Sequence, residues 1–158
     1  MVMLDALVAL ALGCLASAVV TVMRRRYAKS NEVVPGTASR APAAWAGDHS
    51  PEARLHRRLR DAVVALRANP ALEDAWALDS RVSLEQHALA VDEHLVAVAA
   101  LPARVRDEPL ATVAAAVDAV EAAVASLATA GPTLTQRAGL DQAMAQVEAR
   151  VAMLAEGG

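Results

Sequence analysis

Residues 4–23 form a long apolar stretch that is followed at once by three arginines. They read LDALVALALGCLASAVVTVM, and Asp5, near the outer end, is the one charged residue among them. About 20 residues at 1.5 Å each reach roughly 30 Å as a helix, which is the hydrocarbon thickness of a bilayer. A helix of that length in a soluble core normally keeps a polar face, and this stretch has none. We therefore predict a transmembrane helix that anchors the chain.

Two other interpretations of this stretch are a secretory signal peptide cleaved after residues 16–18 and a lipoprotein signal ending at Cys14. A signal peptide needs a basic segment before its apolar core, and no Lys or Arg precedes Arg24. The apolar run also continues past either cleavage point to Met23. For the lipoprotein signal, Ala11 stands where a bulkier aliphatic residue is usual. We favour the uncleaved helix.

The orientation of the anchor follows from the residues just after it. We assign the membrane interface to Arg24, Arg25, Arg26, Tyr27 and Lys29. Basic residues collect on the cytoplasmic side of a membrane helix, and tyrosine is common at the headgroup level. The sequence therefore predicts a single-pass protein of the cell membrane, with a short N-terminus outside and the C-terminal domain in the cytoplasm.

Residues 28–49 are predicted to be a flexible linker between the anchor region, residues 1–27, and a cytoplasmic domain, residues 50–158. Small polar residues and helix breakers recur in this segment, the breakers being Pro35, Gly36, Pro42 and Gly47. Trp45 is the exception. We expect it to pack on the domain or to be exposed, rather than to enter the lipid.

The composition of the chain favours helices over a sheet. Hydrophobic residues make up 56% of it, but aromatic residues only 2% and Phe is absent, so the apolar content is mostly Ala, Val and Leu. The net charge of −3 is too small to indicate nucleic acid binding. A single cysteine, Cys14, excludes an intrachain disulfide. We predict an all-α protein whose cytoplasmic part is an antiparallel bundle of about four helices.

Start and stop signals divide residues 50–158 into these helices. Ser50 and Pro51 begin one that runs to about residue 68, and Pro70 begins a longer one that stops near Pro102. A third begins at residues 107–109 and ends at Gly131. A capping box of Thr133 and Gln136 opens the fourth.

The last two helices each carry a seam with coiled-coil-like spacing of three and four residues. The first seam is Leu110, Val113, Val117, Val120, Val124 and Leu127. The second seam is Leu140, Met144, Val147, Val151 and Leu154. The loop between them is only a few residues long, so the two helices must fold back antiparallel.

Two carboxylates lie within the apolar arc of the helix 70–101, and a buried carboxylate needs a partner. The rows of this arc are Leu84, Val91 and Val98, and Val82, Leu89 and Val96, with Ala88 and Leu95. With a turn at residues 69–70, we expect Glu85 to pair with Arg57 or Arg54. For Asp92 we expect Arg104, Arg106 or Arg150, or contact with water, so that Glu85→Ala destabilises the domain more than Asp92→Ala.

The helix 51–68 is basic as well as amphipathic. Its candidate lipid-facing residues are Arg54, Arg57, Arg58, Arg60 and Arg67. We favour a solvated polar face over a bundle core, because Glu52 and Asp61 dilute the charge and no aromatic residue accompanies it. The alternative is that this helix senses anionic lipid at the membrane surface.

The chain lacks the usual signatures of an enzyme. It has no phosphate-binding glycine loop, no cysteine pair and no Ser/His/Asp grouping in a recognisable context. His87 and His94 are about 10 Å apart along one helix, too far to share a metal ion unaided. A weak site of His49, Glu52 and His56 is imaginable, but we expect no metal and no cofactor.

These observations predict a non-enzymatic scaffold or adaptor at the inner face of the membrane. Its expected partners are the bilayer and either an unknown protein or a second copy bound through the helical seams. We expect no nucleic acid and no small-molecule substrate. The alternative function is the lipid sensor.

Residues 65–70, ALRANP, and 81–86, RVSLEQ, resemble the C-terminal part of the LemA family of bacterial membrane proteins. The resemblance covers about a fifth of the chain, and the Tyr-Asn pairs of the family are missing here. It implies one N-terminal anchor and a long-helix cytoplasmic bundle, and it implies no defined reaction.

Overall fold

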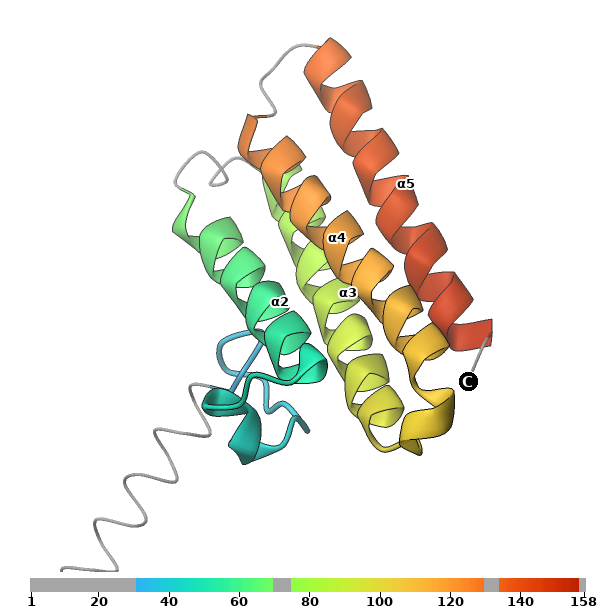
Figure 1. Ribbon diagram of the computed structural model, residues 1–158. Coiled ribbons are helices and arrows are strands. Elements are labelled where there is room, and N and C mark those ends of the chain that lie inside the picture. The colour runs from blue at the N-terminus through green and yellow to red at the C-terminus, as the bar shows by residue number, and fades with distance from the viewer. Residues whose placement is uncertain (1–30, 70–74, 130–133, 157–158) are drawn as a thin grey trace, which may run out of the picture.

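The computed structural model describes residues 31–69, 75–129 and 134–156 of the chain (Figure 1). Its long helices are α2 (Pro51–Ala68), α3 (Ala75–Ala99), α4 (Asp107–Thr129) and α5 (Leu134–Glu156). Two short 3₁₀ helices, η1 (Ala43–Ala46) and η3 (Ala103–Val105), lie between them. The described residues contain no strand, and α2 to α5 lie side by side. The prediction of an all-α bundle with four helices is therefore confirmed.

Some of the predictions lie outside the described residues. These are the transmembrane helix 4–23, the interface residues 24–29 and the cap at Thr133. Within the described part, α4 is long and apolar enough to cross a membrane. That is weak evidence, because the core helix of a soluble protein meets the same test, and α4 packs against α2, α3 and α5. We attribute its apolar composition to the bundle core.

The helix α2 begins and ends where the local chemistry predicts. The Ser50 hydroxyl accepts a hydrogen bond from the Ala53 amide at 3.3 Å, and Pro51 occupies the first helical position, where no amide hydrogen is needed. One face of the helix is buried: Leu55, Leu59, Val63 and Leu66. This face turns α2 toward α3 and α4.

The two predicted seams face the core of the bundle. In α4, Leu110 is half-buried and the rest of the seam is buried. In α5, Leu140, Val147 and Leu154 are buried, and Met144 and Val151 are half-buried. The spacing therefore identified the packed faces of both helices.

The apolar arc of α3 is narrower than the sequence suggests. Leu84, Ala88, Val91 and Leu95 are fully buried, whereas Val82 is 49% exposed. The row that begins at Val82 lies at the edge of the interface, since its other members, Leu89 and Val96, are only half-buried.

Three helices, α2, α3 and α4, all pack against one another and form the core. The helix α5 packs against α3 and α4 and covers the groove between them (Figure 1). Residues 31–49, which we call the strap, contact both α2 and α3. Ser39 reaches Asp92 of α3, and Trp45 packs on His56 of α2.

The prediction of a flexible linker does not describe residues 31–49. Val33, Val34 and Trp45 are buried in the hydrophobic core. The Asn31 side chain donates hydrogen bonds to the carbonyls of Ala41 and Pro42, which folds the strap back on itself. Proline and glycine do prevent a long helix here, but three large apolar side chains are enough to hold an irregular segment against a groove.

The predicted partners of the two α3 carboxylates were wrong. Glu85 pairs with Arg67, at 2.7 and 2.8 Å, and with Arg81 at 3.3 Å. Asp92 pairs with His56 and Ser39, and none of the expected arginines contacts it. Because Asp92 is the more deeply buried of the two carboxylates, the expected order of the two alanine substitutions is reversed, and Asp92→Ala is now expected to destabilise the bundle more than Glu85→Ala. In the observed register of the antiparallel α2–α3 pair, Glu85 lies opposite Arg67, near the C-terminal end of α2, and not opposite Arg57 or Arg54.

The Glu85 pair gives the fold a measurable dependence on pH. Hydrogen bonds from Arg67, and then Arg81, hold the pKa of Glu85 below its usual range. This stabilisation is present above the unfolded-state pKa and is lost as the pH falls through the lower folded-state pKa. We expect Glu85→Gln to lower the free energy of unfolding by about 1–2 kcal/mol at pH 7, and by much less at pH 3. Urea unfolding at the two pH values measures this, and an equal loss at both would contradict it.

Candidate functional site

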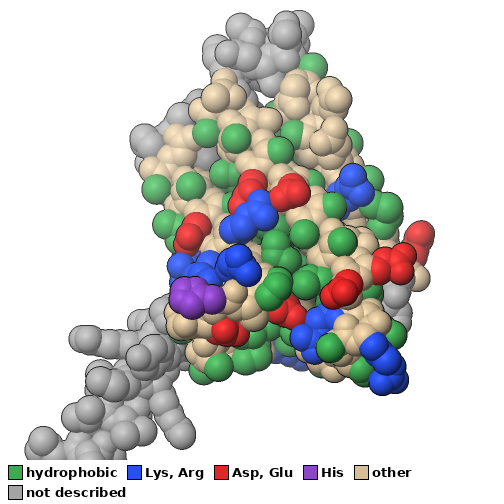
Figure 2. All heavy atoms as spheres, in the orientation of Figure 1, with side chains coloured by type: hydrophobic (Ala, Val, Ile, Leu, Met, Phe, Trp, Pro, Cys, Tyr) green, Lys and Arg blue, Asp and Glu red, His purple; other side chains and the backbone are tan. Residues whose placement is uncertain are grey.

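The structure does not bring the five arginines of α2 together as one free basic face. Arg67 pairs with Glu85, Arg60 contacts Asp61, and Arg57 donates to the backbone carbonyls of the strap. Arg54 is exposed, with no ion pair to the residues that the structure describes. In Figure 2, which has the orientation of Figure 1, acidic and basic side chains lie next to one another on the face of the bundle toward the viewer.

Arg58 joins α2 to α4. Its Nε and Nη2 donate to the two carboxylate oxygens of Glu121 at 3.0 and 2.6 Å, and Nη2 also reaches Asp118 at 2.6 Å. Hydrogen bonds to Glu121, and then Asp118, raise the pKa of the Arg58 guanidinium well above its usual range. Arg58 therefore stays fully charged. Its hydrogen bonds to two residues of α4 fix the position of α4 along the axis of α2.

A buried polar cluster connects the strap to both α2 and α3. His56 and Asp92 are 1% and 3% exposed, and His56 Nδ1 lies 2.7 Å from Asp92 Oδ1. The Ser39 hydroxyl donates to Asp92 Oδ2 at 2.7 Å and accepts from the Ala41 amide. His56 Nε2 is buried without a hydrogen-bond partner among the described residues. The Trp45 ring lies 5.5 Å from the His56 ring, centroid to centroid.

The order of these three groups does not suit nucleophilic catalysis. An activated serine must share a proton with a histidine nitrogen that is itself oriented by a carboxylate. Here Asp92 stands between Ser39 and His56: its carboxylate accepts a hydrogen bond from the serine hydroxyl, and the His56 ring is bound to the other carboxylate oxygen and not to that hydroxyl. The cluster acts as a structural joint.

Sequence reasoning missed this cluster because its members come from three distant segments. The sequence placed His56 only in a weak metal site, but it lies on the same buried face of α2 as Leu59 and Val63. That spacing was the one available signal. Nothing in the local sequence identifies Ser39 as a partner of Asp92.

The weak metal site imagined at the start of α2 is not assembled. His56 is bound to Asp92, and Glu52 accepts from Arg106 Nη1 at 2.9 Å while Arg106 also donates to the Leu101 carbonyl. Across the described ranges, no three His, Cys, Asp or Glu side chains are grouped to hold a metal ion.

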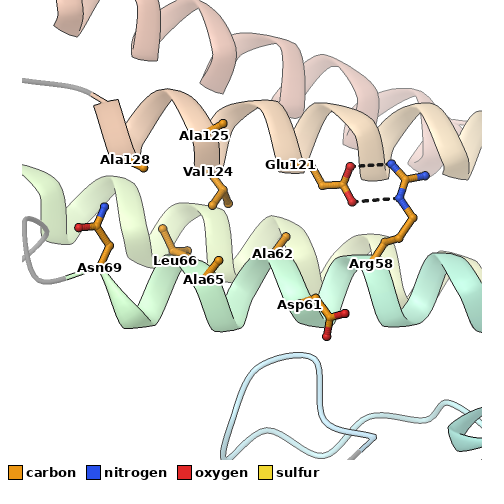
Figure 3. A pocket seen from close by; sticks show the side chains of 10 residues that line it. All are labelled: Arg58, Asp61, Ala62, Ala65, Leu66, Asn69, Glu121, Val124, Ala125 and Ala128. Atoms are coloured by element: carbon orange, nitrogen blue, oxygen red, sulfur yellow. Dashed lines mark hydrogen bonds and ion pairs between the residues drawn. The ribbon is translucent and has the colours of Figure 1, made fainter.

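A groove runs between α2 and α4 on the side that neither α5 nor the strap covers (Figure 3). Its volume is about 520 Å³. The α2 wall is Arg58, Asp61, Ala62, Ala65, Leu66 and Asn69. The α4 wall is Glu121, Val124, Ala125 and Ala128. The Arg58–Glu121 pair closes one end, and the remainder is lined mainly by small apolar side chains.

Comparison of the chain with protein-family models, curated proteins and solved structures finds no match. The resemblance to the LemA family stays a prediction.

Proposed function

We propose that this chain is a single-pass membrane protein whose cytoplasmic bundle is a non-enzymatic scaffold or adaptor at the inner face of the membrane. The observation that carries the proposal is the α2–α4 groove, which none of the residues described in the structure covers. Of the three outer grooves of the α2–α3–α4 core, α5 fills one and the strap fills another. The third offers an apolar, alanine-lined surface on a rigid pair of helices, which is a common way to bind a partner helix.

The buried polar groups support a binding role over a catalytic one. Asp92 and Glu52 are each used in a contact that joins two segments of the fold. The groove contains carboxylates and a guanidinium but no histidine, cysteine or serine. Such a lining is suited to recognition, and it offers no hydroxyl, thiol or imidazole group for nucleophilic catalysis.

The lipid sensor is less well supported by the contacts of α2. Releasing this helix to the membrane would expose Leu59, Val63 and Leu66, which are fully buried. It would also break the ion pairs of Arg58 and Arg67. Exchanging these contacts for a lipid surface offers no net gain in buried apolar area.

The membrane topology is the first test of this proposal. With an epitope tag at the C-terminus, we expect externally added protease to remove the tag in inverted membrane vesicles and to leave it intact in whole spheroplasts. A cytoplasmic marker protein provides the control for vesicle orientation. Removal of the tag from the outside would mean that the bundle is on the wrong side of the membrane.

A further inference from the structure

The shape of the α2–α4 groove selects a helix as its occupant. Its walls are mostly Ala62, Ala65, Val124, Ala125 and Ala128, which offer no hydrogen-bond donor or acceptor from their side chains. An extended segment would leave its own backbone groups unpaired there, whereas an α-helix satisfies them internally. Small side chains also allow two helix axes to approach closely.

The length of the groove sets the length of the occupant. It extends along α2 from Arg58 to Asn69, which at 1.5 Å per residue corresponds to about three helical turns. Leu66 and Val124 are buried beneath it and form an apolar base. An occupant of this size needs a stripe of apolar side chains repeating every three or four residues.

The charges at the closed end of the groove favour an occupant that carries positive charge at that end. Asp118 and Glu121 share one guanidinium, that of Arg58, so these three groups carry a net negative charge. Asp118 is 64% exposed, and Arg58 has already used its Nε and Nη2 donors. Asp61 is paired with Arg60 and points away from α4 (Figure 3), so it adds no net charge to this end. Arg54 lies one turn before the lining.

We propose that the α2–α4 groove binds a basic amphipathic helix of a partner protein, with its apolar stripe between the alanines and a Lys or Arg beside Asp118 and Glu121. This inference rests on the proposed scaffold function and names the class of partner. A second copy of this chain is the competing occupant, and the variants below distinguish it from a basic helix.

Binding of a defined peptide to the full-length chain in detergent micelles tests the proposal. The probe is a labelled helical peptide of about 14 residues, with Ala and Leu on one face and Lys on the other. One control peptide has Glu in place of each Lys, and another has the same composition in an order that destroys the stripe. In fluorescence anisotropy, we expect roughly tenfold or greater preference for the basic amphipathic peptide, reduced by added salt.

Two variants place the binding in the groove. Ala65→Trp fills the space between the helices and should abolish binding, while Ala149→Trp, at an exposed alanine of α5, is the matched control and should bind normally. Asp118→Asn removes an exposed carboxylate and should weaken binding about threefold to tenfold. Circular dichroism confirms that each variant keeps its helices.

Several results would overturn the inference. Equal binding of the basic and acidic peptides, or full binding by Ala65→Trp, would show that the groove does not select a basic helix. A wild-type dimer that Ala65→Trp converts to a monomer would mean that a second copy fills the groove. Partners cross-linked in native membranes at sites away from α2 and α4 would also overturn it, and would leave the scaffold function standing.

Discussion

Asp92→Ala is expected to lower the free energy of unfolding by about 3–5 kcal/mol, the largest loss of any single substitution considered for this chain. The Asp92 carboxylate is 3% exposed and accepts hydrogen bonds from Ser39 Oγ and His56 Nδ1, both at 2.7 Å. Alanine would leave both nitrogens of the buried His56 ring without a partner, because Nε2 already has none among the described residues. Urea unfolding of the purified chain in mild detergent, followed by circular dichroism, measures the loss.

Two further variants separate two contributions to this loss. One is the cost of leaving His56 without a hydrogen-bond partner, and the other is the net contribution of the His56–Asp92 pair to the free energy of unfolding. Asp92→Asn keeps an oxygen that accepts from His56 Nδ1 and should cost about 1–2 kcal/mol. Replacing both residues by leucine, His56→Leu with Asp92→Leu, removes the buried polar groups together and should restore most of the stability. If Asp92→Ala costs less than about 1 kcal/mol, water reaches the carboxylate and the cluster is not a structural joint.

The boundaries of α2 and the packed faces of α4 and α5 could be predicted because local chemistry determines them. Ser50 and Pro51 satisfy or remove the unpaired amides of the first turn, and that requires no information from the rest of the chain. The seam from Val113 to Leu127 follows the period of a helix, so any partner must pack against that side. Such signals depend on a few neighbouring residues.

The pairing of side chains across helices could not be predicted in the same way. It depends on the register of α2 against α3, which the residues within either helix do not determine. Glu85 consequently meets Arg67, near the end of α2, and Asp92 meets His56. The expected partners of both carboxylates assumed another register and were therefore wrong.

The candidate site was beyond sequence reasoning for a related reason. Among the described residues, α5 and the strap occupy the two other grooves of the core and leave the α2–α4 groove open. Both placements depend on long-range contacts. Ala62, Ala65, Ala125 and Ala128 are ordinary helix-forming residues when viewed along the chain. Only the packing shows that they line one open surface.

Trp45→Ala should release the strap from the bundle, with a loss of about 2–4 kcal/mol in its docking free energy. Trp45 is 6% exposed and is the largest side chain by which the strap enters the core. It also packs on His56, so its removal opens the buried Asp92 cluster to water. Trp45→Phe retains most of the apolar contact and is the matched control, with an expected loss under about 1.5 kcal/mol.

Limited trypsin digestion measures strap release directly, because Arg40 lies exposed within the strap. A protease needs a locally unfolded segment around the bond that it cuts, so cleavage after Arg40 reports the population of the released strap. A docking loss of 2 kcal/mol or more corresponds to about 30-fold faster cleavage in Trp45→Ala, and Trp45→Phe should stay within about tenfold of the wild-type rate. Rapid cleavage after Arg40 in the wild-type chain, unchanged by Trp45→Ala, would show that residues 31–49 behave as the flexible linker that their composition suggests.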